Sequence, residues 1–297
     1  MVGHTMSRRK QYVMSGVGAV IALLFLGPYL QMLVTALKPE GELTNTPTSY
    51  LPHQWKWSNF VTLWSRTDVA GYFKSSLIIA FCSTTLVIAV AVPAAYFVAR
   101  NKFGWRTFFL LLVVITQMIQ PTSLVVGVLR SFKDLDRWID NVLGWLHLDF
   151  IHINLIGEYA GLILVNSAFN LAFAVWILNG FFSAIPPELE QAAMIDGASR
   201  FTAMRKITLP LALPGLVTCV IFTFVSAWNE FAMARALVFG NSSKWPLTLG
   251  LSAFQGQYDI EWHYMFATSP IAIVPVVILF ASIERYLVKG LTAGGVK

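Results

Sequence analysis

Residues 75–99 read SSLIIAFCSTTLVIAVAVPAAYFVA, a run without Asp, Glu, Lys or Arg. The hydrocarbon core of a bilayer is about 30 Å thick, and a helix of roughly 20 apolar residues crosses it. A helix satisfies its backbone hydrogen bonds within the segment, as lipid requires, and the run lacks the alternation of a barrel strand. The stretch therefore predicts a membrane-spanning helix.

Five further stretches pass the same test, so the sequence predicts six crossings. They are Gln11–Leu37, Thr107–Leu129, Tyr159–Pro187, Ile207–Asn229 and Trp262–Ile283. With 56% hydrophobic and only 12% charged residues, the chain has too little polar surface for a soluble globular domain. We expect an all-α polytopic membrane protein.

The distribution of Lys and Arg predicts the orientation of these crossings. Segments expected on one side are 1–12, 100–106, 188–206 and 284–297, and the opposite loops are 38–74, 130–158 and 230–261. The first group holds 12 of the 21 cations and 4 of the 15 acids, whereas the second holds 9 cations and 11 acids. Because basic residues favour the cytoplasmic side, both termini are expected in the cytoplasm. The net charge of +6 thus reflects orientation and gives no support to nucleic-acid binding.

The predicted spans and loops divide the chain into four parts. These are the cytoplasmic N-terminus with the first span (1–37), a periplasmic loop (38–74), a core of five spans (75–290) and a cytoplasmic tail (291–297). A cleaved signal peptide is rejected, because the first apolar run is about twice the usual length and lacks a clear cleavage site. From Phe132 to Leu146, apolar residues recur at intervals of three and four residues, which predicts a helix that lies along the outer surface of the membrane.

The cytoplasmic loop between the fourth and fifth spans, residues 185–210, reads IPPELEQAAMIDGASRFTAMRKITLP. Pro186 and Pro187 preset a helix start, and the two acids that follow suit its positive end. Gly197 ends this helix because glycine tolerates the left-handed conformation, and Ser199 can cap a second short helix. A helical hairpin with apolar side chains outside lipid needs a partner groove.

This hairpin resembles the EAA loop of permease subunits of binding-protein-dependent ABC importers. The resemblance is carried by Ala192-Ala193, Gly197 and Ile207-x-Leu209-Pro210 in the family's order and spacing. Three further pieces resemble carbohydrate permeases: Trp228-Asn229-Glu230-Phe231, Pro210–Gly215 and the tail Gly290–Lys297. The tail is most similar to that of the smaller permease subunit of the maltose importer. The resemblance implies a type I importer permease with six transmembrane helices and a cytoplasmic coupling helix.

The resemblance also implies a function and a set of partners. The chain would be the permease subunit of an ATP-driven oligosaccharide importer in a bacterial cytoplasmic membrane and would form half of the translocation path. Its partners would be a second homologous permease, two copies of a cytoplasmic ATPase, an extracytoplasmic solute-binding protein and lipid. Because the chain has no Gly-x-x-x-x-Gly-Lys-Ser/Thr loop, ATP and Mg²⁺ would be bound by the ATPase. The chain itself is expected to hold no cofactor or metal and to catalyse no reaction.

In the family, the EAA loop docks on the ATPase. The resemblance therefore assigns coupling roles to Glu190, Gln191, Ala192, Ala193, Ile195, Asp196 and Gly197. The family's first-position glutamate corresponds to Gln191, which cannot form a salt bridge to an ATPase arginine. Glu190 could replace the family's glutamate only by approaching the ATPase arginine from a different direction, because neighbouring side chains on a helix point about 100° apart. We expect docking to depend on the apolar side chains and on the turn at Gly197.

Amides inside the spans are the candidates for a sugar path, because an amide in lipid is costly unless it faces a bundle interior or a water-filled cavity. The candidates are Gln117 and Gln120, expected on one helix face before a kink at Pro121, Asn166 and Asn170, expected on one face of the fourth span, and Asn229. Interhelical hydrogen bonding is the alternative role for each of them. Asn179 is expected to be structural.

Three other functions compete with an ABC permease. A proton-coupled secondary transporter could use Glu230, an acid at the edge of a span, but would leave the hairpin unexplained. An intramembrane enzyme is disfavoured, because the sequence contains neither His-Glu-x-x-His nor Gly-x-Ser-x-Gly. A structural scaffold is the third. Within the importer hypothesis, an acidic oligosaccharide or a glycerol-phosphate-like solute is the alternative substrate.

Overall fold

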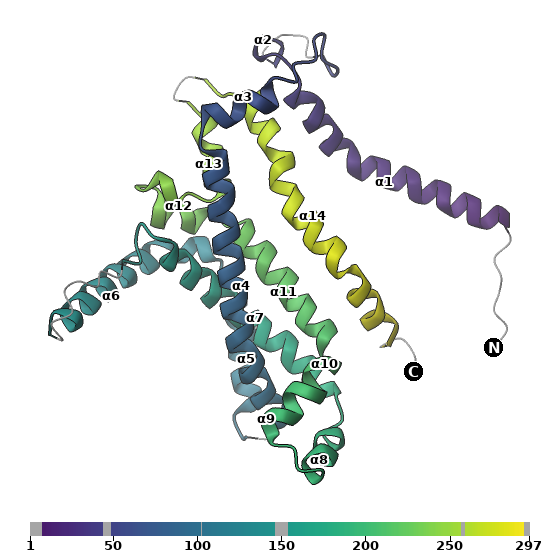
Figure 1. The fold of residues 1–297 in the computed structure, drawn as a ribbon, viewed down its shortest axis with the longest axis vertical. Helices are drawn as coiled ribbons and strands as arrows, with labels where there is room; N and C mark the ends of the chain where they lie inside the picture. Colours follow the sequence, from purple (N-terminus) through teal and green to yellow (C-terminus); the bar gives the residue numbers. More distant parts are fainter. Residues whose placement is uncertain (1–7, 44–48, 102, 146–153, 257–258, 294–297) are drawn as a thin grey trace. The chain divides into compact units, whose positions relative to one another are not determined.

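The computed structural model describes residues 8–43, 49–101, 103–145, 154–256 and 259–293, and within these ranges its regular structure is helical (Figure 1). The chain divides into two compact units, Met1–Val69 with Leu251–Ile273 and Ala70–Gly250 with Val274–Lys297. The domain boundaries expected at residues 37, 74 and 290 stay predictions.

Each predicted span coincides with one long helix or with one bent pair of helices. The long helices are α1 (Arg8–Ala36), α4 (Val69–Arg100), α7 (Tyr159–Ala184) and α14 (Trp262–Ala293). The bent pairs are α5 (Arg106–Gln117) with η1 (Pro121–Leu124) and α6 (Val125–Trp145), and Arg200–Leu211 with α11 (Leu213–Trp228). Counting each pair as one crossing gives six. The polytopic all-α fold predicted from the apolar runs is confirmed.

The third predicted span is not one continuous helix. It ends as α5 at Gln117, and the chain turns by 88° before it continues. Pro121 starts the next helical turn and has no backbone N–H to continue the ladder. The expected kink at Pro121 is confirmed. The expectation that Gln117 and Gln120 share a helix face is wrong, because Gln120 lies in the break with an extended backbone (φ −68°, ψ 127°).

The outer loop that follows contains the helix that its apolar pattern predicted. α6 runs unbroken to Trp145, and the predicted end at Leu146 lies outside the described residues. The Asp136 carboxylate accepts a hydrogen bond from the Leu155 backbone N–H at 3.0 Å, which ties α6 to the segment before α7. Its position along the membrane surface stays a prediction.

The fifth predicted span begins later than expected. The helix from Ser199 onward comprises α9 (Arg200–Ala203), the π turn η2 (Met204–Thr208) and α10 (Leu209–Leu211). The chain bends by 76° before α11 begins at Leu213. Pro214 lies in the first turn of α11, where its missing N–H has no intrahelical partner to lose. Residues 207–212 therefore belong to the loop side of the bend.

Shorter helices complete the two units. They are α2 (Glu40–Leu43), α3 (Asn59–Arg66), α8 (Glu188–Ile195), α12 (Ala232–Val238), η3 (Ser242–Lys244), α13 (Leu247–Gly250) and η4 (Leu251–Phe254). In the first unit, the buried Asn59 amide donates to the carbonyls of Ala36 and Lys38 at 2.8 and 3.0 Å. These bonds satisfy carbonyls at and just beyond the C-terminal end of α1, which have no intrahelical donor.

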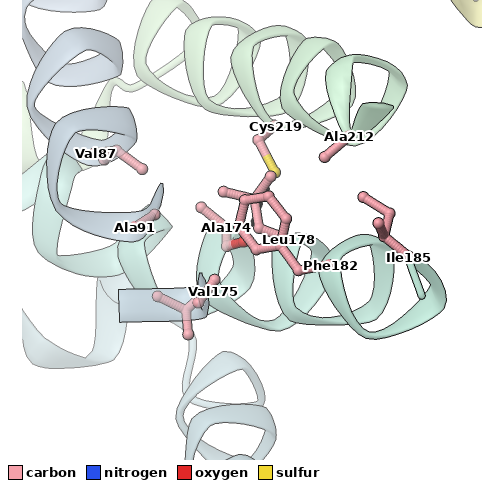
Figure 2. Packing of buried hydrophobic residues seen from close by; sticks show 10 residues of the cluster. Val87, Ala91, Ala174, Val175, Leu178, Phe182, Ile185, Ala212 and Cys219 are labelled. Atoms are coloured by element: carbon pink, nitrogen blue, oxygen red, sulfur yellow. Dashed lines mark hydrogen bonds between the residues drawn. The ribbon is translucent and has the colours of Figure 1, made fainter. Parts of the chain in front are cut away.

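The second unit is built on α4, α7 and α11 (Figure 2). Leu178 and Phe182 of α7 are fully buried, in one cluster with Ala91 of α4 and Cys219 of α11. Small residues let the helix backbones approach closely. Gly215 of α11 is an example, because an added Cβ would overlap the ring of Phe181 of α7. The close packing of these helices is what positions the C-terminal ends of α4 and α7.

Gly161, in the first turn of α7, is expected to tolerate no side chain. A Cβ there would overlap the carbonyl oxygen of Leu155 and would lie 2.9 Å from its carbonyl carbon. Because backbone atoms cannot move aside cheaply, Gly161→Ala should destabilise the protein by roughly 1–3 kcal/mol. The measurement is the melting temperature of the purified protein in detergent.

Gly180 provides a control in the same helix. A Cβ at Gly180 meets nothing within 4 Å, and alanine is the better helix former. Gly180→Ala should therefore leave the melting temperature unchanged or slightly raised. Equal effects of the two substitutions would contradict the packing assigned to Gly161.

Candidate functional site

The loop between α7 and α11 folds into the predicted helical hairpin, at the lower end of the second unit in Figure 1. Its first helix, α8, starts directly after Pro187 and ends in a left-handed turn, with Gly197 at φ +89°. The Ala198 N–H bonds to the Ala193 carbonyl at 2.9 Å, and the Gly197 N–H bonds to that of Met194 at 3.1 Å. This is the glycine-ended cap that satisfies the last carbonyls of a helix. The prediction that Gly197 ends the helix is confirmed.

The second helix of the hairpin begins at the predicted cap. The Ser199 hydroxyl accepts a hydrogen bond from the Thr202 backbone N–H at 3.2 Å. Beyond Ala203 the helix widens into the π turn that ends at Thr208. Turns of π helix are rare in proteins, and those that do occur are often found at functional sites.

The outer surface of the hairpin is apolar and uncovered. Ile195 is 86% exposed, Phe201 is 65% exposed and Leu189 is 45% exposed. Of the other residues assigned to coupling, Gln191, Ala192 and Asp196 are also exposed, and Ala193 is half-buried. Large exposed apolar side chains on a protruding hairpin mark a candidate interaction surface. Phe201 was missed by the sequence analysis, although an aromatic residue in a loop predicted to lie outside lipid is a signal for such a surface.

Glu190 faces the opposite way and is only 5% exposed. Its Oε2 accepts a hydrogen bond from the Tyr96 hydroxyl at 2.7 Å, and its Oε1 accepts from Arg100 Nε at 2.8 Å. The Thr208 hydroxyl donates to the same Oε1. Both oxygens are thus held by donors of the same chain. Glu190 does not present a free carboxylate to a docking partner, so the geometry gives no support to its standing in for Gln191.

The contacts of Glu190 keep it ionised. Burial raises the pKa of Glu190, but hydrogen bonds from Thr208, Tyr96 and Arg100 outweigh it, and the net pKa lies below the ordinary range of a glutamate. A carboxyl with a depressed folded-state pKa contributes stability above its unfolded-state pKa and loses it as pH falls through the folded-state pKa.

A pH series of melting temperatures tests this. The wild type should melt above Glu190→Gln by a constant margin near neutral pH, and the margin should shrink as the pH falls below the ordinary range of a carboxyl. Glu188→Gln is the matched control, because Glu188 is an exposed acid of the same helix and should matter little at any pH. A margin that grows in acid would contradict the assignment.

The predicted path residues lie at separate places. Gln117 of α5 donates to the Phe169 carbonyl of α7 at 3.1 Å, which is an interhelical bond. Asn170 donates to the Asn166 carbonyl at 2.8 Å, so the pair shares a face of α7 as expected. The Asn166 amide nitrogen is buried and has no hydrogen-bond acceptor within the described residues. Gln120 and Asn229 are exposed.

A hollow beside Gln117 is mainly apolar. It lies between α5 and α7, has a volume of about 500 Å³ and is lined by Gln117 and Thr116 among mainly apolar side chains. Only Thr116 and Gln117 of this lining offer side-chain groups that could pair with a hydroxyl. Asn179 lies elsewhere on α7 and accepts from Arg106 at 3.4 Å, in accord with a structural role. Sugar contact by the five candidate amides stays a prediction.

Glu230 has a structural role in this fold. Its carboxylate accepts a hydrogen bond from the Met233 backbone N–H at 2.7 Å, in the first turn of α12. Its carbonyl accepts from the Thr248 hydroxyl at 2.7 Å. Capping a helix explains an acid at this position, which removes the observation that favoured a proton-coupled transporter.

Comparison with known proteins identifies relatives along nearly the whole chain. Residues 91–293 match the model of a family described as binding-protein-dependent transport system inner membrane component. The sulfoquinovosyl glycerol transport system permease protein SmoH of Agrobacterium fabrum is 33% identical over 272 residues, 92% of this chain and 89% of the relative. The trehalose/maltose transport system permease protein MalG of Thermococcus litoralis is 31% identical over 285 residues, 95% of each chain.

A solved structure has the same fold. It is a chain of a bacterial ABC transporter involved in the import of the acidic polysaccharide alginate, with a TM-score of 0.73 and 18% sequence identity. The superposition covers 96% of this chain and 99% of that chain. The chain therefore has a fold already seen in a solved structure.

Proposed function

The chain belongs to the family of binding-protein-dependent transport system inner membrane components, and from this premise we propose that it is the permease subunit of an ATP-driven oligosaccharide importer. The observation that carries the proposal is the exposed apolar face of the hairpin around Ile195, on a helix that Gly197 ends. A surface of this kind outside lipid needs a protein groove. That groove belongs to a cytoplasmic ATPase.

Energy enters this importer through the partner ATPase. The chain lacks a phosphate loop, so ATP and Mg²⁺ are bound by two copies of the ATPase. A second homologous permease completes the translocation path, and an extracytoplasmic binding protein delivers the substrate. Closure of the ATPases displaces the hairpin, and the bundle alternates between outward-open and inward-open states.

Both termini and the hairpin lie on the cytoplasmic side. The excess of Lys and Arg in the segments that include 1–12 and 188–206 supports this orientation. It brings the hairpin to the side where ATP is available.

An oligosaccharide is the substrate class supported by the names of the relatives. One relative is named for trehalose and maltose, and the other is named for sulfoquinovosyl glycerol, which carries a sulfonate. A neutral oligosaccharide is the first candidate, because the tail Gly290–Lys297 also resembles the maltose importer. The second relative favours an acidic glycoside as the alternative.

Reconstitution tests the proposal. Vesicles that hold this chain with the permease, ATPase and binding proteins encoded beside it should accumulate a labelled oligosaccharide only when ATP is present on the hairpin side. Neutral maltodextrins, acidic oligosaccharides and glycerol phosphate form the substrate panel. Uptake that needs no ATPase but collapses with an uncoupler would overturn the proposal in favour of proton coupling.

A further inference from the structure

Glu190 lies where three separate segments of the chain meet. Tyr96 and Arg100 are four residues apart, on one face of the last turns of α4, and both donate to its carboxylate. Thr208, the last residue of the π turn, donates from the other side and is fully buried. One carboxylate of α8 therefore binds the end of α4 and the π turn that precedes α11.

Arg100 extends this connection to a fourth segment. Its Nη1 donates to the Ile185 carbonyl at 3.0 Å, at the C-terminal end of α7. Its Nη2 lies 2.7 Å from Glu190 Oε1, and both side chains are largely buried. The hydrogen bond from Arg100 Nε to the same carboxylate, at 2.8 Å, is charge-assisted and therefore of the strong kind. The ends of α4 and α7 are thus fixed to α8 by one ion pair.

Packing alone does not explain how α8 is held here. A small cleft of about 150 Å³ lies beside the ion pair, lined by residues that include Asn101, Gln191 and Met194. A site that is polar and roomy enough for water provides few van der Waals contacts. The hydrogen bonds of Glu190 are therefore what fix α8 against α4 on this side.

We propose that Glu190 is a positioning residue that transmits movement of the coupling hairpin to α4 and to the π turn. This inference rests on the proposed function, in which the ATPase displaces the outer face of the hairpin. Ile195 presents that outer face, and Glu190 on the same short helix holds the inner contacts. Because three donors hold one carboxylate, α8 cannot shift without moving the end of the second span.

The test replaces the carboxylate by an amide in the complete transporter. In Glu190→Gln the side chain is neutral and has a single acceptor oxygen, so it cannot accept from all three donors. The substitution also leaves Arg100 buried without its counter-ion. We expect the variant complex to co-purify with its ATPase and to hydrolyse ATP, while the amount of substrate imported per ATP falls at least tenfold. A purely structural role would lower the yield of the complex and leave this ratio unchanged.

Other variants make the test specific. Glu188→Gln, an exposed acid in the same turn, should retain the wild-type ratio. Arg100→Gln should reproduce the loss, and the double variant should be no worse than the worse single variant, because both remove one link. Tyr96→Phe removes a single donor and should lower the ratio about threefold without loss of the complex.

The outcomes separate this inference from the proposed function. A wild-type complex that neither binds an ATPase nor hydrolyses ATP would overturn the proposed function, whatever Glu190 does. An active wild type with Glu190→Gln within twofold of its ratio of substrate to ATP would overturn the inference alone. If Glu190→Gln is degraded in the cell, Tyr96→Phe decides, and an unchanged ratio there overturns the inference too.

Discussion

Ile195→Asp should reduce ATP-driven uptake at least 100-fold while the protein reaches the membrane in normal amounts. The side chain is 86% exposed, so the substitution places no charge in the core of the chain. In the complex, the aspartate would be buried in an apolar groove without a partner, at a cost of several kcal/mol. Since each 1.4 kcal/mol is a factor of ten, about 3 kcal/mol accounts for the loss. The measurement is uptake together with co-purification of the ATPase.

The conservative change at the same position is the control. Ile195→Val keeps a branched apolar side chain and should retain uptake within about twofold, because only one methylene is lost. Normal uptake and normal ATPase binding by Ile195→Asp would show that the apolar face of the hairpin is not a docking surface.

Gly197→Val should reduce uptake about 50-fold without melting the membrane core. At φ +89° a β-branched residue is strongly disfavoured, and the strain is of order 1–3 kcal/mol. A Cβ at this position meets nothing within 4 Å, so backbone strain is the whole effect. The hairpin would lose the turn that orients its second helix. Uptake is measured together with the melting temperature, which distinguishes this local effect from unfolding of the protein.

Gly197→Asn is the matched variant for that prediction. Asparagine adopts the left-handed region far more readily than valine does, so it should keep most of the uptake. If the two variants showed equal uptake, or if both were inactive, the backbone conformation of residue 197 would not be what determines uptake.

The membrane fold was predictable because its signals are local. Six long uncharged runs, the turn at Gly197 and the cap at Ser199 each depend on a few neighbouring residues, and the structure contains all of them. The bends were only partly predictable. Pro121 predicted the bend in the third span. The start of α11 at Leu213 follows a π turn, which no periodicity in the sequence reveals.

The orientation of the Glu190 side chain toward Arg100 could not be predicted from the sequence of the loop alone. Its main partner, Arg100, is 90 residues away in sequence and reaches it only because α4 and α7 end at the same place. A helical wheel gives the angle between Glu190 and Gln191 but not what lies on either side of them. Likewise, Gln120 was expected on a helix face, and only the observed break places it elsewhere.

The central claim is that the hairpin between the fourth and fifth spans contacts an ATP-hydrolysing subunit in the cytoplasm. A photoreactive residue at position 195, activated in intact cells, tests it most directly, with position 138 on α6 as a comparison site, since Trp138 is also exposed. The probe at 195 should form an adduct with the ATPase, and the probe at 138 should not. An adduct of position 195 with lipid or with the extracytoplasmic binding protein would contradict it.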